Sequence, residues 1–114
     1  MVVLRSEKET HNLAKKIASL TKAGNAILLK GELGSGKTAF AREFINSFFK
    51  KKQEVNSPTF NIVQQYYPKN MPEIWHFDLY RIKKTEELHE LGIEDVFSNA
   101  IAIIEWPEIL EQNL

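Results

Sequence analysis

One glycine-rich segment has the spacing of a phosphate-binding loop. Residues 31–38 read G-E-L-G-S-G-K-T and match the P-loop pattern G-x-x-x-x-G-K-T. Glycines let the backbone bend closely around an anion, because they carry no Cβ atom. In such a loop we expect Lys37 to reach the β- and γ-phosphates of a nucleoside triphosphate and the Thr38 hydroxyl to help hold Mg²⁺. The sequence therefore predicts a nucleotide site.

Two acidic residues compete for the role of a second magnesium-ordering group, which phosphoryl transfer requires. Glu105 follows an apolar run at 100–104, where a buried strand is expected to end. Asp78 lies within the aromatic segment 75–81, and its alternative role is an ion pair with Arg81. His76 would share a strand face with Asp78, which is compatible with a proton relay, although a lone strand histidine is more often a packing residue.

Two further residues have two interpretations each. Thr59 follows Pro58 and is either a turn-stabilising hydroxyl or a sensor of the γ-phosphate. Trp106 comes just after a predicted strand and either joins the core or lies over a ligand or partner; we favour contact with the nucleotide pocket. The three histidines lack the ligand spacing of zinc sites, so no zinc is expected.

The elements needed to position these residues can be read along the chain. The apolar run 26–30 predicts a buried parallel strand before the glycine loop, and apolar residues from Phe40 to Phe49 recur at helical spacing after it. Ser6 and Glu9 form a capping box for an earlier helix. The remaining predictions are a hairpin of strands 60–67 and 74–80 around a turn at 68–72, a helix at 85–91 stopped by Gly92, a turn or helix at 93–97, a central parallel strand at 100–104 and a helix or loop at 107–114.

This order predicts an α/β fold: a three-layer, P-loop NTPase-like sandwich whose mixed sheet combines parallel core strands with an antiparallel hairpin. Ligands of such sheets bind at the carboxyl ends of the strands. We therefore expect the P-loop, Thr59 and Glu105 to meet at one sheet edge, where Asp78 could join them from its own strand.

Composition bounds the function classes. We expect one domain over 1–114, and the absence of cysteine excludes disulfides, thiolate metal sites and cysteine nucleophiles. No leader and no apolar stretch near 18 residues are visible, so a soluble, cytoplasmic protein without membrane contact is expected. Fifteen basic residues balance fifteen acidic ones, which argues against a dedicated nucleic-acid binder, and we interpret the cluster 50–52 as a solvated helix end.

Four motifs together resemble the TsaE (formerly YjeE) family of bacterial P-loop ATPases. They are the P-loop at 31–38, Ser-Pro-Thr-Phe at 57–60, His-Phe-Asp-Leu-Tyr-Arg at 76–81 and Ile-Glu-Trp at 104–106. The resemblance runs from Glu9 to Pro107, nearly the whole chain. It implies an Mg²⁺-dependent ATPase, weak alone, that works with TsaB and TsaD in the threonylcarbamoyladenosine (t6A) modification of tRNA and meets tRNA through that complex.

The resemblance also implies roles for single residues. The residues with a catalytic role would be Lys37, Asp78, Glu105 and Thr59. Of these, Asp78 and Thr59 would belong to loops that respond to the nucleotide and support hydrolysis. Thr38 and Glu105 would bind Mg²⁺. The nucleotide would contact Thr10 near its adenine or ribose, Trp106 beside the site, and Leu33, Gly34, Ser35, Gly36, Lys37, Thr38 and Ala39 along the loop.

Two departures from the family pattern are visible. Ala39 stands where the family usually has a second threonine, which removes a hydroxyl that could bond the α-phosphate and predicts weaker nucleotide affinity. Family members usually continue beyond 104–107 with further strands, so we expect either a short member or a domain without its C-terminal strands, with an exposed sheet edge. The alternative functions are a small nucleotide or metabolite kinase and a nucleotide-gated binding module that does not hydrolyse ATP.

Overall fold

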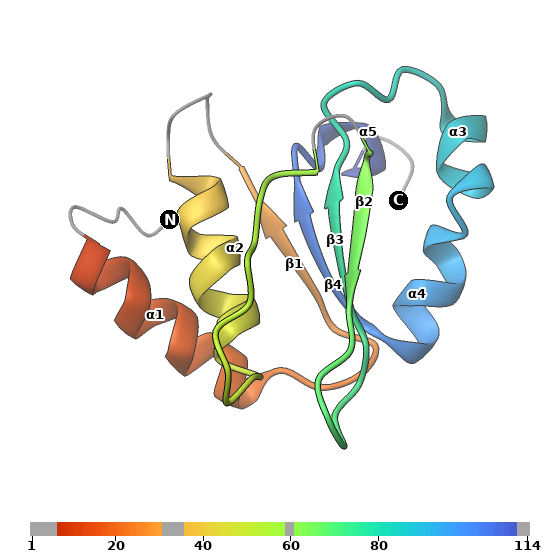
Figure 1. Cartoon of the computed structure of the whole chain (residues 1–114). Coiled ribbons are helices and arrows are strands. Elements are labelled where there is room, and N and C mark those ends of the chain that lie inside the picture. The colour runs from red at the N-terminus through yellow and green to blue at the C-terminus, as the bar shows by residue number, and fades with distance from the viewer. Residues whose placement is uncertain (1–6, 31–35, 59–60, 112–114) are drawn as a thin grey trace.

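A mixed four-stranded sheet lies between two layers of helices (Figure 1). The computed structural model describes residues 7–30, 36–58 and 61–111. Along the chain the elements are α1 (Glu7–Leu20), β1 (Ala26–Leu29), α2 (Lys37–Asn46), β2 (Val63–Tyr66), β3 (Ile74–Asp78), α3 (Thr85–Glu90), α4 (Ile93–Asn99), β4 (Ile101–Glu105) and α5 (Glu108–Glu111). The predicted α/β class with a mixed sheet is confirmed.

The strand order is β1-β4-β3-β2. Both β1 and β3 run parallel to β4, whereas β2 pairs with β3 in the antiparallel sense. The predicted hairpin is therefore confirmed, with shorter strands than expected. Because β3 also pairs with β4, it brings Asp78 level with Glu105 in the parallel part of the sheet.

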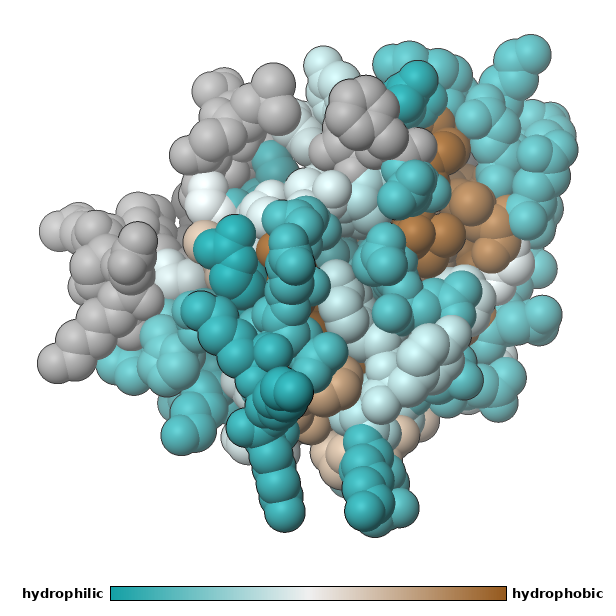
Figure 2. Space-filling view, in the orientation of Figure 1, coloured by the Kyte–Doolittle hydropathy of each residue, from teal (hydrophilic) through white to brown (hydrophobic). Residues whose placement is uncertain are grey.

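Alternation of side chains divides the core between the two faces of the sheet. On the face covered by α1 and α2, Ile74, Ile101 and Ile103 of the sheet pack against Phe40 and Phe44 of α2. On the opposite face, below α3 and α4, a second cluster contains Phe77, Leu79, Ile82, Leu88, Ile93, Val96, Ala100, Ala102, Ile104 and Leu110. Figure 2 shows a mostly hydrophilic surface in this view, with hydrophobic atoms visible mainly between the sheet and α3 and α4.

The two apolar runs of the sequence have different places in the sheet. Every residue of β4 is buried, as expected of a central parallel strand. The prediction of a parallel strand at 26–30 is confirmed by β1, which pairs in parallel with β4, but the predicted burial is wrong: β1 lies at the sheet edge, and Leu28 is 39% exposed. The reason is that β1 pairs with β4 alone among the described strands, and the described helices leave the Leu28 side of β1 open.

Two glycines with positive φ stand at helix starts. Gly36 precedes α2 with φ 92°, and Gly92 separates α3 from α4 with φ 70°, so the predicted helix stop at Gly92 is confirmed. Helix α2 ends at Asn46, before Phe48 and Phe49, which pack beyond it. The predicted cap residue Ser6 lies outside the described residues. Within the described ranges, no helix has the length and apolar character to cross a bilayer.

Candidate functional site

The described part of the glycine motif forms the start of α2. Gly36 adopts the left-handed conformation that glycine tolerates, and a Cβ atom built there would meet nothing within 4 Å, so the backbone conformation rather than crowding favours glycine. Lys37 and Thr38 open the first helical turn, and the N-terminus of a helix favours an anion. Leu33, Gly34 and Ser35 lie outside the described residues.

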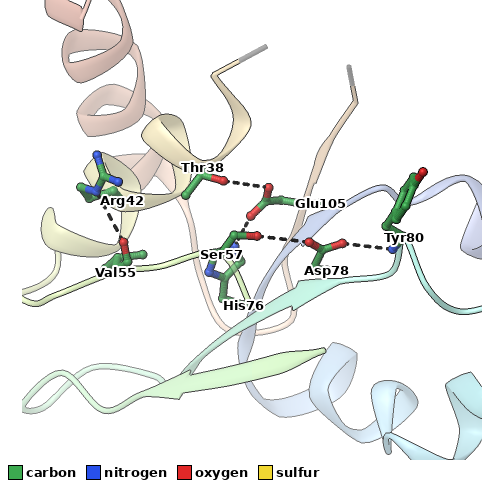
Figure 3. A network of polar contacts seen from close by, with 8 residues as sticks. All are labelled: Thr38, Arg42, Val55, Ser57, His76, Asp78, Tyr80 and Glu105. Atoms are coloured by element: carbon green, nitrogen blue, oxygen red, sulfur yellow. Dashed lines mark hydrogen bonds and ion pairs between the residues drawn. The ribbon is translucent and has the colours of Figure 1, made fainter. Parts of the chain in front are cut away.

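A buried carboxylate connects this helix start to the sheet. Glu105 is 2% exposed and is the last residue of β4. The Thr38 hydroxyl donates to Glu105 Oε1 at 3.2 Å, and His76 Nε2 lies 2.6 Å from Glu105 Oε2 (Figure 3). Residues far apart in the sequence, from α2, β3 and β4, thus converge on one carboxyl group at the carboxyl ends of the strands, where the sequence placed the site.

Asp78 forms a second polar centre beside the first. It ends β3 and is the register partner of Glu105. One carboxylate oxygen accepts a hydrogen bond from the Ser57 hydroxyl at 3.1 Å, and the other accepts from the Tyr80 backbone N–H at 3.0 Å (Figure 3). Asp78 therefore ties the segment before β2 to the segment after β3. Thr59 falls outside the described residues.

Trp106 lies against the lysine of the motif. The Lys37 ammonium nitrogen is 3.7 Å from the centroid of the indole ring, and the Tyr80 ring packs on the same indole at 4.8 Å between centroids. Trp106 has φ 59°, a conformation that costs a bulky L residue on the order of 1–3 kcal/mol. The chain turns sharply here, and the indole lies beside Lys37. Contact of Trp106 with a nucleotide stays a prediction.

A cavity of about 530 Å³ lies between α1 and α2. Thr10 and Ala39, both predicted to contact nucleotide, are among its lining residues. Its wall also carries positive charge; the other lining residues are His11, Arg42, Glu43, Asn46, Phe49, Lys50 and Lys52. The volume and the mixture of polar, basic and aromatic groups suit part of a nucleotide.

The donors at the helix start fit a magnesium ion. Mg²⁺ prefers oxygen ligands and takes only one or two from the protein, because it keeps several waters and binds substrate phosphates. The Thr38 hydroxyl and the Glu105 carboxylate, already 3.2 Å apart, offer such a pair. In the described ranges no cluster of three or more histidine, cysteine or acidic side chains could hold a metal by itself.

Sequence reasoning missed three contacts of this site. His76 shares a face of β3 with Asp78, as expected, and its ring also reaches Glu105 on the neighbouring strand, which the sequence did not indicate. Ser57 and Tyr80 hold Asp78 and Trp106, respectively. The signal for His76 was the parallel pairing of β3 with β4, which no local pattern in the sequence specifies.

Comparison with known proteins gives a consistent result. The family model described as "Threonylcarbamoyl adenosine biosynthesis protein TsaE" matches residues 4–114. A Rickettsia typhi protein named tRNA threonylcarbamoyladenosine biosynthesis protein TsaE is 46% identical over 114 residues, which are 100% of this chain and 78% of the relative. The Bacillus subtilis protein of the same name is 34% identical over 108 residues, 94% of this chain and 66% of the relative.

A solved structure has a similar fold. The crystal structure of Bacillus subtilis YdiB superposes with a TM-score of 0.75 at 27% sequence identity. The match covers 97% of this chain and 66% of YdiB. The chain thus spans about two thirds of that structure.

Proposed function

The chain belongs to the TsaE family, and from this premise we propose that it is the ATP-binding and ATP-hydrolysing component of tRNA t6A modification, acting with TsaB and TsaD. The names of its relatives place them in this biosynthesis. The near neutrality of the chain, with 15 basic and 15 acidic residues, fits a protein that meets tRNA through its partners rather than by a basic surface of its own.

One observation carries the enzymatic part of the proposal: the Thr38 hydroxyl and the buried Glu105 carboxylate face each other at 3.2 Å. A hydroxyl in the first turn of the P-loop helix and an acid at the end of the adjacent central strand are the two protein groups that order Mg²⁺ in P-loop enzymes. A structural cap would not require an acid buried to 2% exposure on the sheet.

The residues divide the work of positioning and charge neutralisation. Lys37 would leave the Trp106 ring to bind the β- and γ-phosphates, while Gly36 and the first turn of α2 donate backbone N–H groups. Thr38 and Glu105 would hold Mg²⁺, which when bound neutralises charge that develops on the phosphates. Thr10 and Ala39 would line the part of the site that takes the nucleoside.

Asp78 would couple the nucleotide to neighbouring segments. It bonds both Ser57 and the backbone of Tyr80, and Tyr80 packs on Trp106. A shift of Lys37 away from Trp106 therefore has a route to the segment that leads toward Thr59. In this proposal Thr59 and Asp78 support hydrolysis by responding to the γ-phosphate.

The test is phosphate release from ATP by the purified protein, alone and with TsaB and TsaD, each in Mg²⁺ and in EDTA. We expect slow turnover alone, stimulation by the partners, and loss of turnover in EDTA. GTP in place of ATP tests the nucleotide preference. Absence of turnover in every Mg²⁺ arm, with ATP bound, would instead indicate a nucleotide-gated binding module. Turnover without any response to TsaB and TsaD would contradict the partner assignment.

A further inference from the structure

His76 is the most completely buried polar side chain at the candidate site. It is 0% exposed and stands on β3, with β4 on one side and β2 on the other. The only described hydrogen-bond partner of its ring is Glu105, at 2.6 Å from Nε2, and Nδ1 has no partner within the described residues. Burial of a ring with one unpaired nitrogen costs free energy. The hydrogen bond between His76 and Glu105 must therefore have a structural or functional reason.

The environment of the ring selects one tautomer. With Glu105 ionised, Nε2 must carry a proton to donate to Oε2. Among the described residues, none forms a hydrogen bond with Nδ1, so the contact of Nε2 with Glu105 is the one that orients the ring. The ring therefore contributes one hydrogen bond to Glu105 through Nε2, and this bond leaves Oε1 of the carboxylate facing Thr38.

The two carboxylate oxygens of Glu105 contact residues of two different elements, β3 and α2. Oε2 is fixed by a ring packed in the core, whereas Oε1 meets the hydroxyl of Thr38 at the start of α2. Figure 3 shows the carboxylate between these two residues. A glutamate side chain has three rotatable bonds, and a single rigid donor on one oxygen restricts the position of the other.

We propose that His76 is a positioning residue of the magnesium site: its Nε2–H group holds Oε2 of Glu105 so that Oε1 faces Thr38. The inference rests on the proposed function, since it assigns the carboxylate to Mg²⁺ binding. It departs from a proton relay through Asp78, because the donated hydrogen bond goes to Glu105. Groups that orient a metal ligand typically affect metal affinity or activity by about 10–100-fold.

Two amide substitutions separate the hydrogen bond from the general effect of altering a buried ring. The amide nitrogen of His76→Gln can occupy roughly the position of Nε2 and donate to Glu105, whereas the shorter His76→Asn places its amide near Nδ1. Both changes introduce a buried amide of similar polarity, so His76→Asn is a matched control for His76→Gln. Thermal unfolding of both variants without nucleotide establishes how much each loses in stability alone.

The measurement is the affinity for a fluorescent ATP analogue in Mg²⁺ and in EDTA. We expect His76→Asn to lose about tenfold in the affinity measured with Mg²⁺ and little in EDTA, because only the metal ligand is displaced. His76→Gln should recover most of the loss. Equal affinities of the two variants in Mg²⁺, or an equal loss in Mg²⁺ and EDTA, would overturn the assignment.

If His76→Asn does not fold, a measurement on the wild-type protein still tests whether Nε2 of His76 donates to Glu105. In protein labelled with ¹⁵N in histidine, the ring of His76 should show the Nε2–H tautomer, and Glu105→Ala should shift that signal. An Nδ1–H tautomer would overturn the proposal. If the wild-type protein binds the analogue equally well in Mg²⁺ and EDTA, the proposed magnesium role of Glu105 fails instead, which distinguishes the two hypotheses.

Discussion

The buried polar residues of the described part of the chain are few, and they belong to the motifs that predicted the site. They are Thr10, Lys37, His76, Asp78 and Glu105. Burial of such groups opposes folding unless each is paired, and several pair with one another or with neighbouring residues: Glu105 with Thr38 and His76, Lys37 with Trp106, and Asp78 with Ser57. Four of the five lie at the start of α2 or on β3 and β4, where the proposed site is, whereas Thr10 lies on α1.

At the residue scale, substitutions of Lys37 and Glu105 should impair different functions, ATP binding in the first case and hydrolysis in the second. Lys37→Ala removes the charge that meets the phosphates, so ATP binding should be lost. Glu105→Ala removes a metal ligand, so turnover should fall roughly hundredfold while ATP affinity in EDTA stays close to that of the wild type. Binding of a fluorescent analogue and phosphate release measure the two effects. Lys84→Ala, at an exposed lysine, is the control, and parallel loss of binding in both site variants would contradict the division of roles.

A threonine at position 39 should increase the affinity for ATP. Ala39→Thr adds the hydroxyl that the resemblance to the family implies at this position, on the wall of the cavity that Thr10 also lines. One additional hydrogen bond is worth about 0.5–1.5 kcal/mol, which corresponds to a roughly twofold to tenfold increase in ATP affinity. Ala39→Val has nearly the same shape without the hydroxyl. Titration calorimetry should show tighter binding for the threonine variant only; tighter binding for both would assign the gain to packing.

At the scale of elements, the local sequence pattern predicted the helices and strands themselves better than it predicted which strands pair with one another. The helices, the hairpin, the stop at Gly92 and the central strand β4 follow from periodicity and turn residues in their own segments. The edge position of β1 and the pairing of β3 with β4 depend on partners far along the chain. For the same reason the sequence located Thr38 and Glu105 at one edge but did not predict that His76 bonds Glu105.

Two isolated substitutions test the contrast between β1 and β4. Ile103 is 0% exposed in the centre of the sheet, whereas Leu28 is 39% exposed on β1. Ile103→Ala should lower the free energy of unfolding by about 2–5 kcal/mol, because it leaves a cavity in the core. Leu28→Ala should cost less than about 1 kcal/mol. Urea unfolding monitored by circular dichroism measures both, and comparable losses would mean that β1 is covered on its Leu28 side.

At the scale of the whole molecule, the nucleotide should stabilise the fold. The proposed site draws residues from α2, β3 and β4, so unfolding any of them removes it. ATP with Mg²⁺ at about 100 times its dissociation constant should add about 2.7 kcal/mol to the free energy of unfolding. Thermal melting with and without ATP checks this expectation, and the Lys37→Ala variant should show no shift. A shift of the same size in that variant would place the bound nucleotide elsewhere.

The pairing of β1 with β4 has a consequence for synthesis of the protein. Among the described strands, β4 is the only neighbour of β1, and residues 26–29 pair with residues 102–105. On the ribosome, the strand that leads into the glycine motif emerges long before the segment that must pair with it. The nascent chain therefore cannot close the contact between Thr38 and Glu105 before residue 105 has been synthesised and has left the ribosome, so ATP with Mg²⁺ can favour the fold only after that point.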